Sequence, residues 1–310
     1  MLWVVIGHAP LGDPESGPLW VTMLYRFAYS FHMPLFMMVS GYLFYSTRIS
    51  NELEKEWPYH RIIRDKSVRL LLPGFIFSLV ALATKVAFPS EMSRQTGIST
   101  NELVHGFVYP YDNPLRELWF IVTLFWFFLL APLWRFTLSN LWTICMSSLF
   151  FVVLYFWHPN TEFLCIGRVF RYGIWFYLGL AASRIDAVEK LIEKPLWIVP
   201  LVGVLLYVVG MMINSIITTM GGIAFSFGLA LILDRFLSRA FFSFRNYTYQ
   251  IFLMGIFAQF VVKIVYRHVE LPYLPTYLLC VAFGLYVPVL VSKLLEWKNW
   301  KPLLLCVGLK

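Results

Sequence analysis

Charged residues are scarce in this sequence. Asp, Glu, Lys and Arg make up 14% of the 310 residues, whereas an ordinary soluble domain carries about a quarter. A soluble globular protein of this length could not cover its surface with so few charges, so that class is excluded. Hydrophobic residues make up 59%, which excludes a disordered chain, because such chains have little apolar surface to bury. The composition therefore predicts a polytopic membrane protein.

Cysteine is also rare. No CxxC pair and no cluster of His and Cys occurs among the four cysteines, so the sequence predicts neither a disulfide framework nor a metal site. A P-loop, a GxGxxG motif and a GxSxG nucleophile elbow are absent too. The usual sequence signals for nucleotide binding and serine hydrolysis are therefore missing.

Acidic residues are fewer than basic ones. The chain has 17 Asp and Glu against 25 Lys and Arg, a net charge of +8. A basic chain can bind nucleic acid, but membrane proteins also concentrate Lys and Arg in cytoplasmic loops. We expect no nucleic-acid partner. If the segment 47–69 is cytoplasmic and the spans alternate, most basic residues lie on the cytoplasmic side, which predicts a plasma or inner-membrane protein with both termini cytoplasmic.

Long apolar runs are abundant. A bilayer core of about 30 Å needs about 20 apolar residues in a helix. Ten runs are candidates: 1–11, 28–46, 68–88, 117–136, 138–157, 165–183, 195–212, 215–237, 247–266 and 274–297. The first is too short to cross and is expected to be a truncated helix. We predict an all-α bundle of about ten transmembrane helices, forming a single domain over residues 1–310 in contact with membrane lipid.

Two histidines occur in the first two runs. Polar groups inside spans are costly and mark functional positions, and histidine suits general base catalysis near neutral pH. For His8 the structural alternative is an interfacial histidine that only hydrogen-bonds a neighbour, and the residues alone favour it slightly. His32 opens the second run and would face the same side of the membrane as His8. Ser40 and Gly41 are interpreted as a small pair that lets helices pack closely.

Two groups of cations are further candidates. Arg64, Lys66 and Arg69 flank a run on the predicted cytoplasmic side. Composition alone favours positive-inside anchoring, and phosphate binding is the functional alternative. Arg168 and Arg171 are three residues apart and are predicted to share a helix face. Snorkelling to the interface and lining a polar cavity are equally compatible with them.

Four stretches resemble the membrane acyltransferase-3 family, in particular its fucose 4-O-acetylase-like and exopolysaccharide O-acyltransferase branch. They are LWVVIGHAP (2–10), FHMPLFMMVSGYLF (31–44), KSVRLLLPGFIFS (66–78) and LWFIVTLFWFFLLAPL (118–133). The resemblance implies a ten-helix enzyme that transfers an acyl group, usually acetyl, from cytoplasmic acyl-CoA. The acceptor it implies is a sugar hydroxyl of an envelope glycan or a lipid-linked saccharide. The family's first-span histidine corresponds to His8, and its cytoplasmic basic patch to Arg64, Lys66 and Arg69.

The sequence departs from the family pattern at two positions. The arginine expected about three helical turns before His8 would precede Met1, and many relatives have a histidine where this chain has Gly255. Our hypothesis is that His8 acts as general base, with a covalent acyl-histidine relay as an open alternative. The upstream arginine, or Arg168 and Arg171, would bind the acceptor or the developing oxyanion. A glycan transporter or flippase, or an inactive partner subunit, are the alternative functions.

Overall fold

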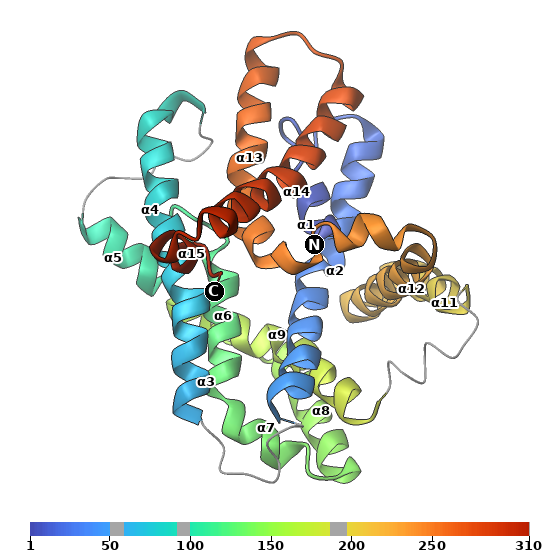
Figure 1. The fold of residues 1–310 in the computed structure, drawn as a ribbon. Coiled ribbons are helices and arrows are strands. Elements are labelled where there is room, and N and C mark those ends of the chain that lie inside the picture. The colour runs from blue at the N-terminus through green and yellow to red at the C-terminus, as the bar shows by residue number, and fades with distance from the viewer. Residues whose placement is uncertain (50–58, 92–99, 187–196, 310) are drawn as a thin grey trace. The chain divides into compact units, whose positions relative to one another are not determined.

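The computed structural model describes residues 1–49, 59–91, 100–186 and 197–309, and every regular element in these ranges is helical (Figure 1). The prediction of an all-α membrane protein is confirmed. By contacts, the chain forms two compact units. Unit 1 comprises Met1–Leu35 with Glu189–Val307, and unit 2 comprises Phe36–Val188 with Gly308–Lys310. The single domain expected over 1–310 stays a prediction.

Unit 1 is built on two helical hairpins and the start of the chain. The hairpins are α11 (Ile198–Ile213) with α12 (Ser215–Phe242), and α13 (Thr248–His268) with α14 (Tyr273–Lys298), each pair lying side by side (Figure 1). The other helices are α1 (Leu2–Gly7), α15 (Lys301–Cys306) and the part of α2 (Leu19–Phe44) that precedes Phe36. A short 3₁₀ helix, Arg245–Tyr247, leads into α13.

Unit 2 contains the rest of α2 and the helices up to residue 186. They are α3 (Tyr59–Lys66), α4 (Leu72–Ala87), α5 (Thr100–Val108), α6 (Leu118–Leu129), α7 (Ala131–Thr137), α8 (Leu141–Phe156) and α9 (Ile166–Arg184). Two π-helical turns, Tyr45–Ile49 and Ser67–Leu71, follow α2 and α3. Two 3₁₀ turns are Pro89–Glu91 and Phe163–Cys165. Aromatic side chains, including Phe127, Trp134 and Phe176, form a buried core.

A helix overlaps each of the ten predicted runs, but fewer helices satisfy the length and composition of a membrane span. Among the described residues, five helices do so: Tyr59–Ala87, Phe163–Arg184, Ser215–Leu237, Arg245–His268 and Tyr273–Lys298. The pair α6 and α7 makes a sixth if counted as one bent span, while α8 and α11 are shorter apolar helices. The chain is therefore a multi-pass membrane protein, and the number of ten crossings stays a prediction.

The run 117–136 forms two helices instead of the continuous one that we predicted. The axes of α6 and α7 differ by 57°, and the break falls at Leu130. Pro132 lies in the first turn of α7, where its missing N–H does not have to continue the preceding helix. The indole N–H of Trp134 donates to the carbonyl oxygen of Phe127 at 2.7 Å. A side chain thus satisfies one carbonyl group that the break leaves without a helical partner.

Candidate active site

His8 lies directly after α1, in unit 1. Its backbone has φ −94° and ψ 0°, and its N–H donates to the carbonyl oxygen of Val4 at 3.0 Å. The side chain is half-buried. The imidazole ring lies 5.9 Å from the ring of Tyr29, edge to face. Gly7 allows this approach, because a Cβ at Gly7 would lie 3.0 Å from the Tyr29 ring.

His32 lies on α2, also in unit 1, and is 4% exposed. Its Nδ1 is 2.8 Å from the carbonyl oxygen of Ala28. A carbonyl oxygen only accepts, so Nδ1 carries the proton and Nε2 is the acceptor in the neutral ring. The Tyr29 ring lies 4.7 Å from the His32 ring. Tyr29 therefore contacts both histidines, and it brings together two positions that the sequence predicted separately.

Three side chains from α13 and α14 bind the backbone around His8. Gln259 Nε2 donates to the carbonyl oxygen of Val5 at 2.8 Å, Tyr277 Oη donates to that of Ile6 at 3.1 Å, and Lys263 Nζ donates to that of His8 at 2.8 Å. None of these three residues was among the candidates predicted from the sequence. Gln259 and Lys263 could have been recognised from the sequence, because two polar residues four apart inside an apolar run are unusual.

Arg64, Lys66 and Arg69 belong to unit 2 and differ in exposure. Arg64, in α3, is exposed, whereas Lys66 and Arg69 are half-buried. The Lys66 ammonium lies 4.2 Å from the centre of the Phe128 ring, so a cation–π contact holds it. Arg69 lies within the π-helical turn that follows α3. Such turns occur frequently at functional sites.

Arg168, also in unit 2, has a carboxylate partner and two aromatic partners. Its Nε and Nη2 donate to the two carboxylate oxygens of Glu162 at 2.8 and 2.9 Å. The guanidinium lies 4.5 Å from the ring centres of both Tyr111 and Trp119. Arg171, one helical turn further along α9, is exposed. The two arginines thus have different surroundings although their spacing is that of one helix face.

Gly255 lies where α13 and α14 cross in unit 1. A Cβ at this position would be 2.9 Å from the carbonyl oxygen of Gly284, which is closer than real Cβ atoms approach backbone. A histidine at this position, which the family resemblance led us to expect, would therefore require the two helices to separate. The observed packing of α13 against α14 has no room for a side chain at Gly255.

The sequence model of the acyltransferase-3 family, described as an acyltransferase domain, matches residues 1–293. The chain belongs to the acyltransferase-3 family. No curated protein and no solved structure matches the chain. As a member of the acyltransferase-3 family with several membrane-spanning helices, the protein is a multi-pass membrane acyltransferase. Within the described ranges, no three or more His, Cys, Asp or Glu side chains gather as metal ligands.

Proposed function

We propose that this acyltransferase-3 protein transfers an acetyl group from cytoplasmic acetyl-CoA to a sugar hydroxyl of an envelope glycan or a lipid-linked saccharide. It would act in the plasma or inner membrane with both termini cytoplasmic. The observation that carries the proposal is the family match over residues 1–293, which includes every proposed site residue.

His8 is the proposed general base. Its imidazole removes the proton of the acceptor hydroxyl as the oxygen attacks the thioester carbonyl carbon. A C–O bond forms, the C–S bond breaks, and the imidazolium returns its proton to the CoA thiolate, so the products are an acetyl ester and free CoA. A positioned base typically accelerates such a step by about 10²–10⁴-fold. His32 is proposed as the second catalytic histidine, and its ring contact with Tyr29 at 4.7 Å supports this role.

The cations of unit 2 are proposed to bind the negative groups of the reaction. Arg64, Lys66 and Arg69 would bind the phosphates of CoA, because guanidinium and ammonium groups suit phosphate. Arg168 and Arg171 would bind the acceptor or the developing oxyanion. Arg168 has five N–H donors, and Glu162 accepts from Nε and Nη2. The remaining donors have no hydrogen-bond partner among the residues that the structure describes, so they could bind a ligand while Glu162 holds the guanidinium.

The decisive experiment replaces His8 by Ala in a strain that lacks the endogenous gene. Wild-type protein should restore acetyl esters on the surface glycan, and His8→Ala should not, at equal amounts of protein in the membrane. His158→Ala is the matched control, because His158 is an exposed histidine in unit 2 and should restore the esters fully. Full acetylation with His8→Ala would refute the role of His8. Loss of exported polymer, without loss of ester per unit of polymer, would instead indicate transport.

Coenzyme binding can be tested separately with Arg64→Ala. Removing one charge-assisted hydrogen bond costs about 1.5–3 kcal/mol, so the KM for acetyl-CoA should rise by roughly 10- to 100-fold while kcat changes little. Acetyl-pantetheine, which lacks the phosphates at the nucleotide end, serves as the control donor. Its KM should be the same for Arg64→Ala and wild type. An equal rise in KM for both donors would contradict a phosphate contact.

A further inference from the structure

We propose that Lys263 positions His8, together with Gln259 and Tyr277, by binding carbonyl groups at the end of α1 and that of His8 directly after it. The inference rests on the proposed function, since it assumes that the His8 imidazole is the base. Lys263 and Gln259 on α13 and Tyr277 on α14 are thereby assigned as positioning residues for the proposed reaction. None of them is proposed to touch substrate; each acts on the backbone that carries His8.

The carbonyl groups at the end of α1 need hydrogen-bond donors from outside the helix. The last four carbonyl groups of a helix have no partner within the helix, and unpaired polar groups are costly in a membrane protein. At the end of α1, Gln259 binds the carbonyl oxygen of Val5, Tyr277 that of Ile6 and Lys263 that of His8, at 2.8, 3.1 and 2.8 Å. The backbone is thus held at three positions within four residues.

The donors come from two helices that pack against each other. Gln259 and Lys263 are four residues apart on α13, so they present neighbouring side chains on one face. Tyr277 lies on α14, and the phenol of Tyr273, one turn earlier, accepts from the backbone N–H of Leu11 at 3.4 Å. The contacts therefore continue past His8 into the following segment. They link residues 254 to 271 positions apart in the sequence.

Lys263 differs from the other two donors because it carries a charge. Lysine within a membrane-spanning helix is costly, and the Lys263 side chain is half-buried. Its ammonium lies at the C-terminal end of α1, where the helix dipole favours a positive charge. The hydrogen bond goes to the carbonyl group of His8 itself. This bond fixes the Cα from which the imidazole projects.

Aromatic rings on α2 also contact α1 and help to fix its position. Trp3 lies edge to face with Phe27 and Phe31, at ring separations of 5.3 and 5.6 Å. Hydrogen bonds from α13 and α14 together with ring contacts from α2 resist a shift of α1. A misplacement of about 1 Å at a reacting group can cost about 10²-fold in rate. Loss of the Lys263 donor should therefore lower kcat rather than substrate affinity.

The experiment uses the full-length protein, purified in detergent, with acetyl-CoA and a glycan acceptor. Lys263→Met keeps the length of the side chain but removes the donor, and should lower kcat by roughly 10- to 100-fold with the KM for acetyl-CoA unchanged. Lys263→Arg keeps a cationic donor and should recover most of the lost rate. Lys293→Met is the matched control, since Lys293 is an exposed lysine on α14, and should retain wild-type kcat.

A double-mutant cycle separates positioning from a merely structural role. In the His8→Ala background, Lys263→Met should cause no further loss of the residual rate, because no base remains to position. An equal loss in both backgrounds would overturn the proposal. If Lys263→Met yields too little folded protein, Tyr277→Phe, which removes only one hydroxyl, takes its place and should give a smaller loss with the same dependence on His8.

The inference and the proposed function fail in different ways. If His8→Ala keeps the wild-type rate, the proposed base is wrong. If His8→Ala is inactive while Lys263→Met and Tyr277→Phe keep the wild-type kcat, only the positioning role is wrong.

Discussion

The two halves of α2 contact their surroundings in different ways. Before residue 36, within unit 1, α2 presents side chains to the candidate site: the ring of Tyr29 contacts the rings of His8 and His32. After residue 36, within unit 2, α2 packs through its backbone as well as through side chains: Gly41 faces the carbonyl group of Phe176 on α9, and the Phe44 ring contacts that of Phe128. The contacts with the two histidines and the glycine-mediated packing against α9 thus lie in separate segments of one helix.

Small residues make the second kind of contact possible. On α9, Gly179 faces the carbonyl group of Met38, as Gly41 faces that of Phe176. A Cβ at either glycine would lie closer to that carbonyl oxygen than side chains approach backbone. Membrane helices associate through such small residues because they gain little from the hydrophobic effect in lipid. The interpretation of Ser40 and Gly41 as a packing pair agrees with the position of Gly41.

The largest effect should follow from Gly41→Ala. Its methyl group would force α2 away from α9, and overpacking of this kind typically costs about 1–3 kcal/mol or more. We expect a marked fall in the thermal unfolding midpoint and in the yield of monodisperse protein. Gly12→Ala is the control, since a Cβ at Gly12 meets no atom within 4 Å. Equal midpoints for the two variants would refute the backbone packing described for the second half of α2.

The helices were predictable because hydrophobic run length is a strong signal in a membrane protein. Each of the ten runs overlaps a helix, including α13 over most of 247–266. Helix ends were less predictable: α2 begins at Leu19 rather than at residue 28, and α5 lies in a segment that had no apolar run. The helix propensity and the tertiary packing of single turns decide where these helices end. Neither of them produces a periodic pattern that can be recognised in the sequence.

The candidate site was predictable only as separate residues. His8 and His32 could be selected because each is a polar group in an apolar run, yet their common neighbour, Tyr29, carries no such signal. Lys263 and Tyr277 could not be assigned to His8, because their hydrogen bonds to the end of α1 connect the two ends of the sequence. Tertiary packing sets these pairings. The same holds for Arg168, whose partner Glu162 is close in sequence while Tyr111 is not.

A smaller effect is expected from Tyr29→Leu, which tests the first half of α2. An aromatic contact is worth about 0.5–1.5 kcal/mol, so the loss of the ring contacts with the two histidines should lower kcat by roughly 2- to 10-fold. Tyr42→Leu changes the same residue type in the second half of α2 and should alter the unfolding midpoint more than kcat. A reversed pattern, with Tyr42→Leu affecting kcat and Tyr29→Leu only stability, would contradict the division of α2. Steady-state kinetics give kcat for both variants, and thermal unfolding gives their midpoints.

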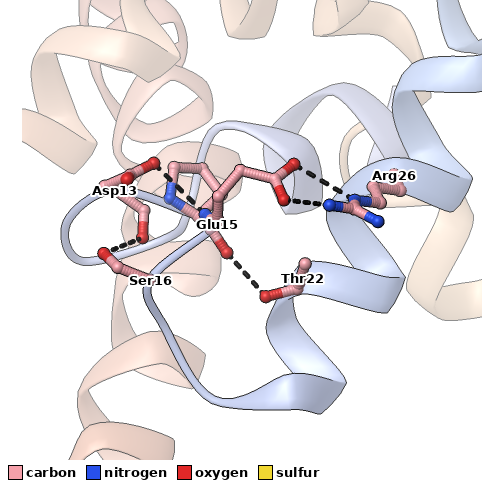
Figure 2. Close-up of polar contacts among 6 residues, drawn as sticks. Asp13, Glu15, Ser16, Thr22 and Arg26 are labelled. Carbon is pink, nitrogen blue, oxygen red and sulfur yellow. Dashed lines mark hydrogen bonds and ion pairs between the residues drawn. The ribbon is translucent and has the colours of Figure 1, made fainter.

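The smallest effect concerns the beginning of α2 and the loop before it. Figure 2 shows the carboxylate of Glu15 facing the guanidinium of Arg26, with both Glu15 oxygens bound. The loop is also fastened by Thr22 Oγ1, which donates to the carbonyl oxygen of Pro14 at 2.7 Å. The hydrogen bonds from Arg26 lower the pKa of Glu15. Since both side chains are largely exposed, the pair contributes little to stability.

The direction of the pH dependence follows from that lowered pKa. A carboxyl group whose pKa is lower in the folded than in the unfolded protein stabilises the fold above its unfolded pKa, and the contribution disappears as pH falls through the folded pKa. Glu15→Gln should therefore have a slightly lower unfolding midpoint than wild type at pH 7, and the difference should vanish in acid. A difference that is constant from pH 7 to pH 3 would show that the charge of Glu15 is not responsible. The loop, Tyr29 and the two histidines all lie in unit 1. An unchanged kcat in Glu15→Gln would therefore indicate that the contact between Glu15 and Arg26 fastens the loop without affecting the ring contacts of Tyr29 with the histidines.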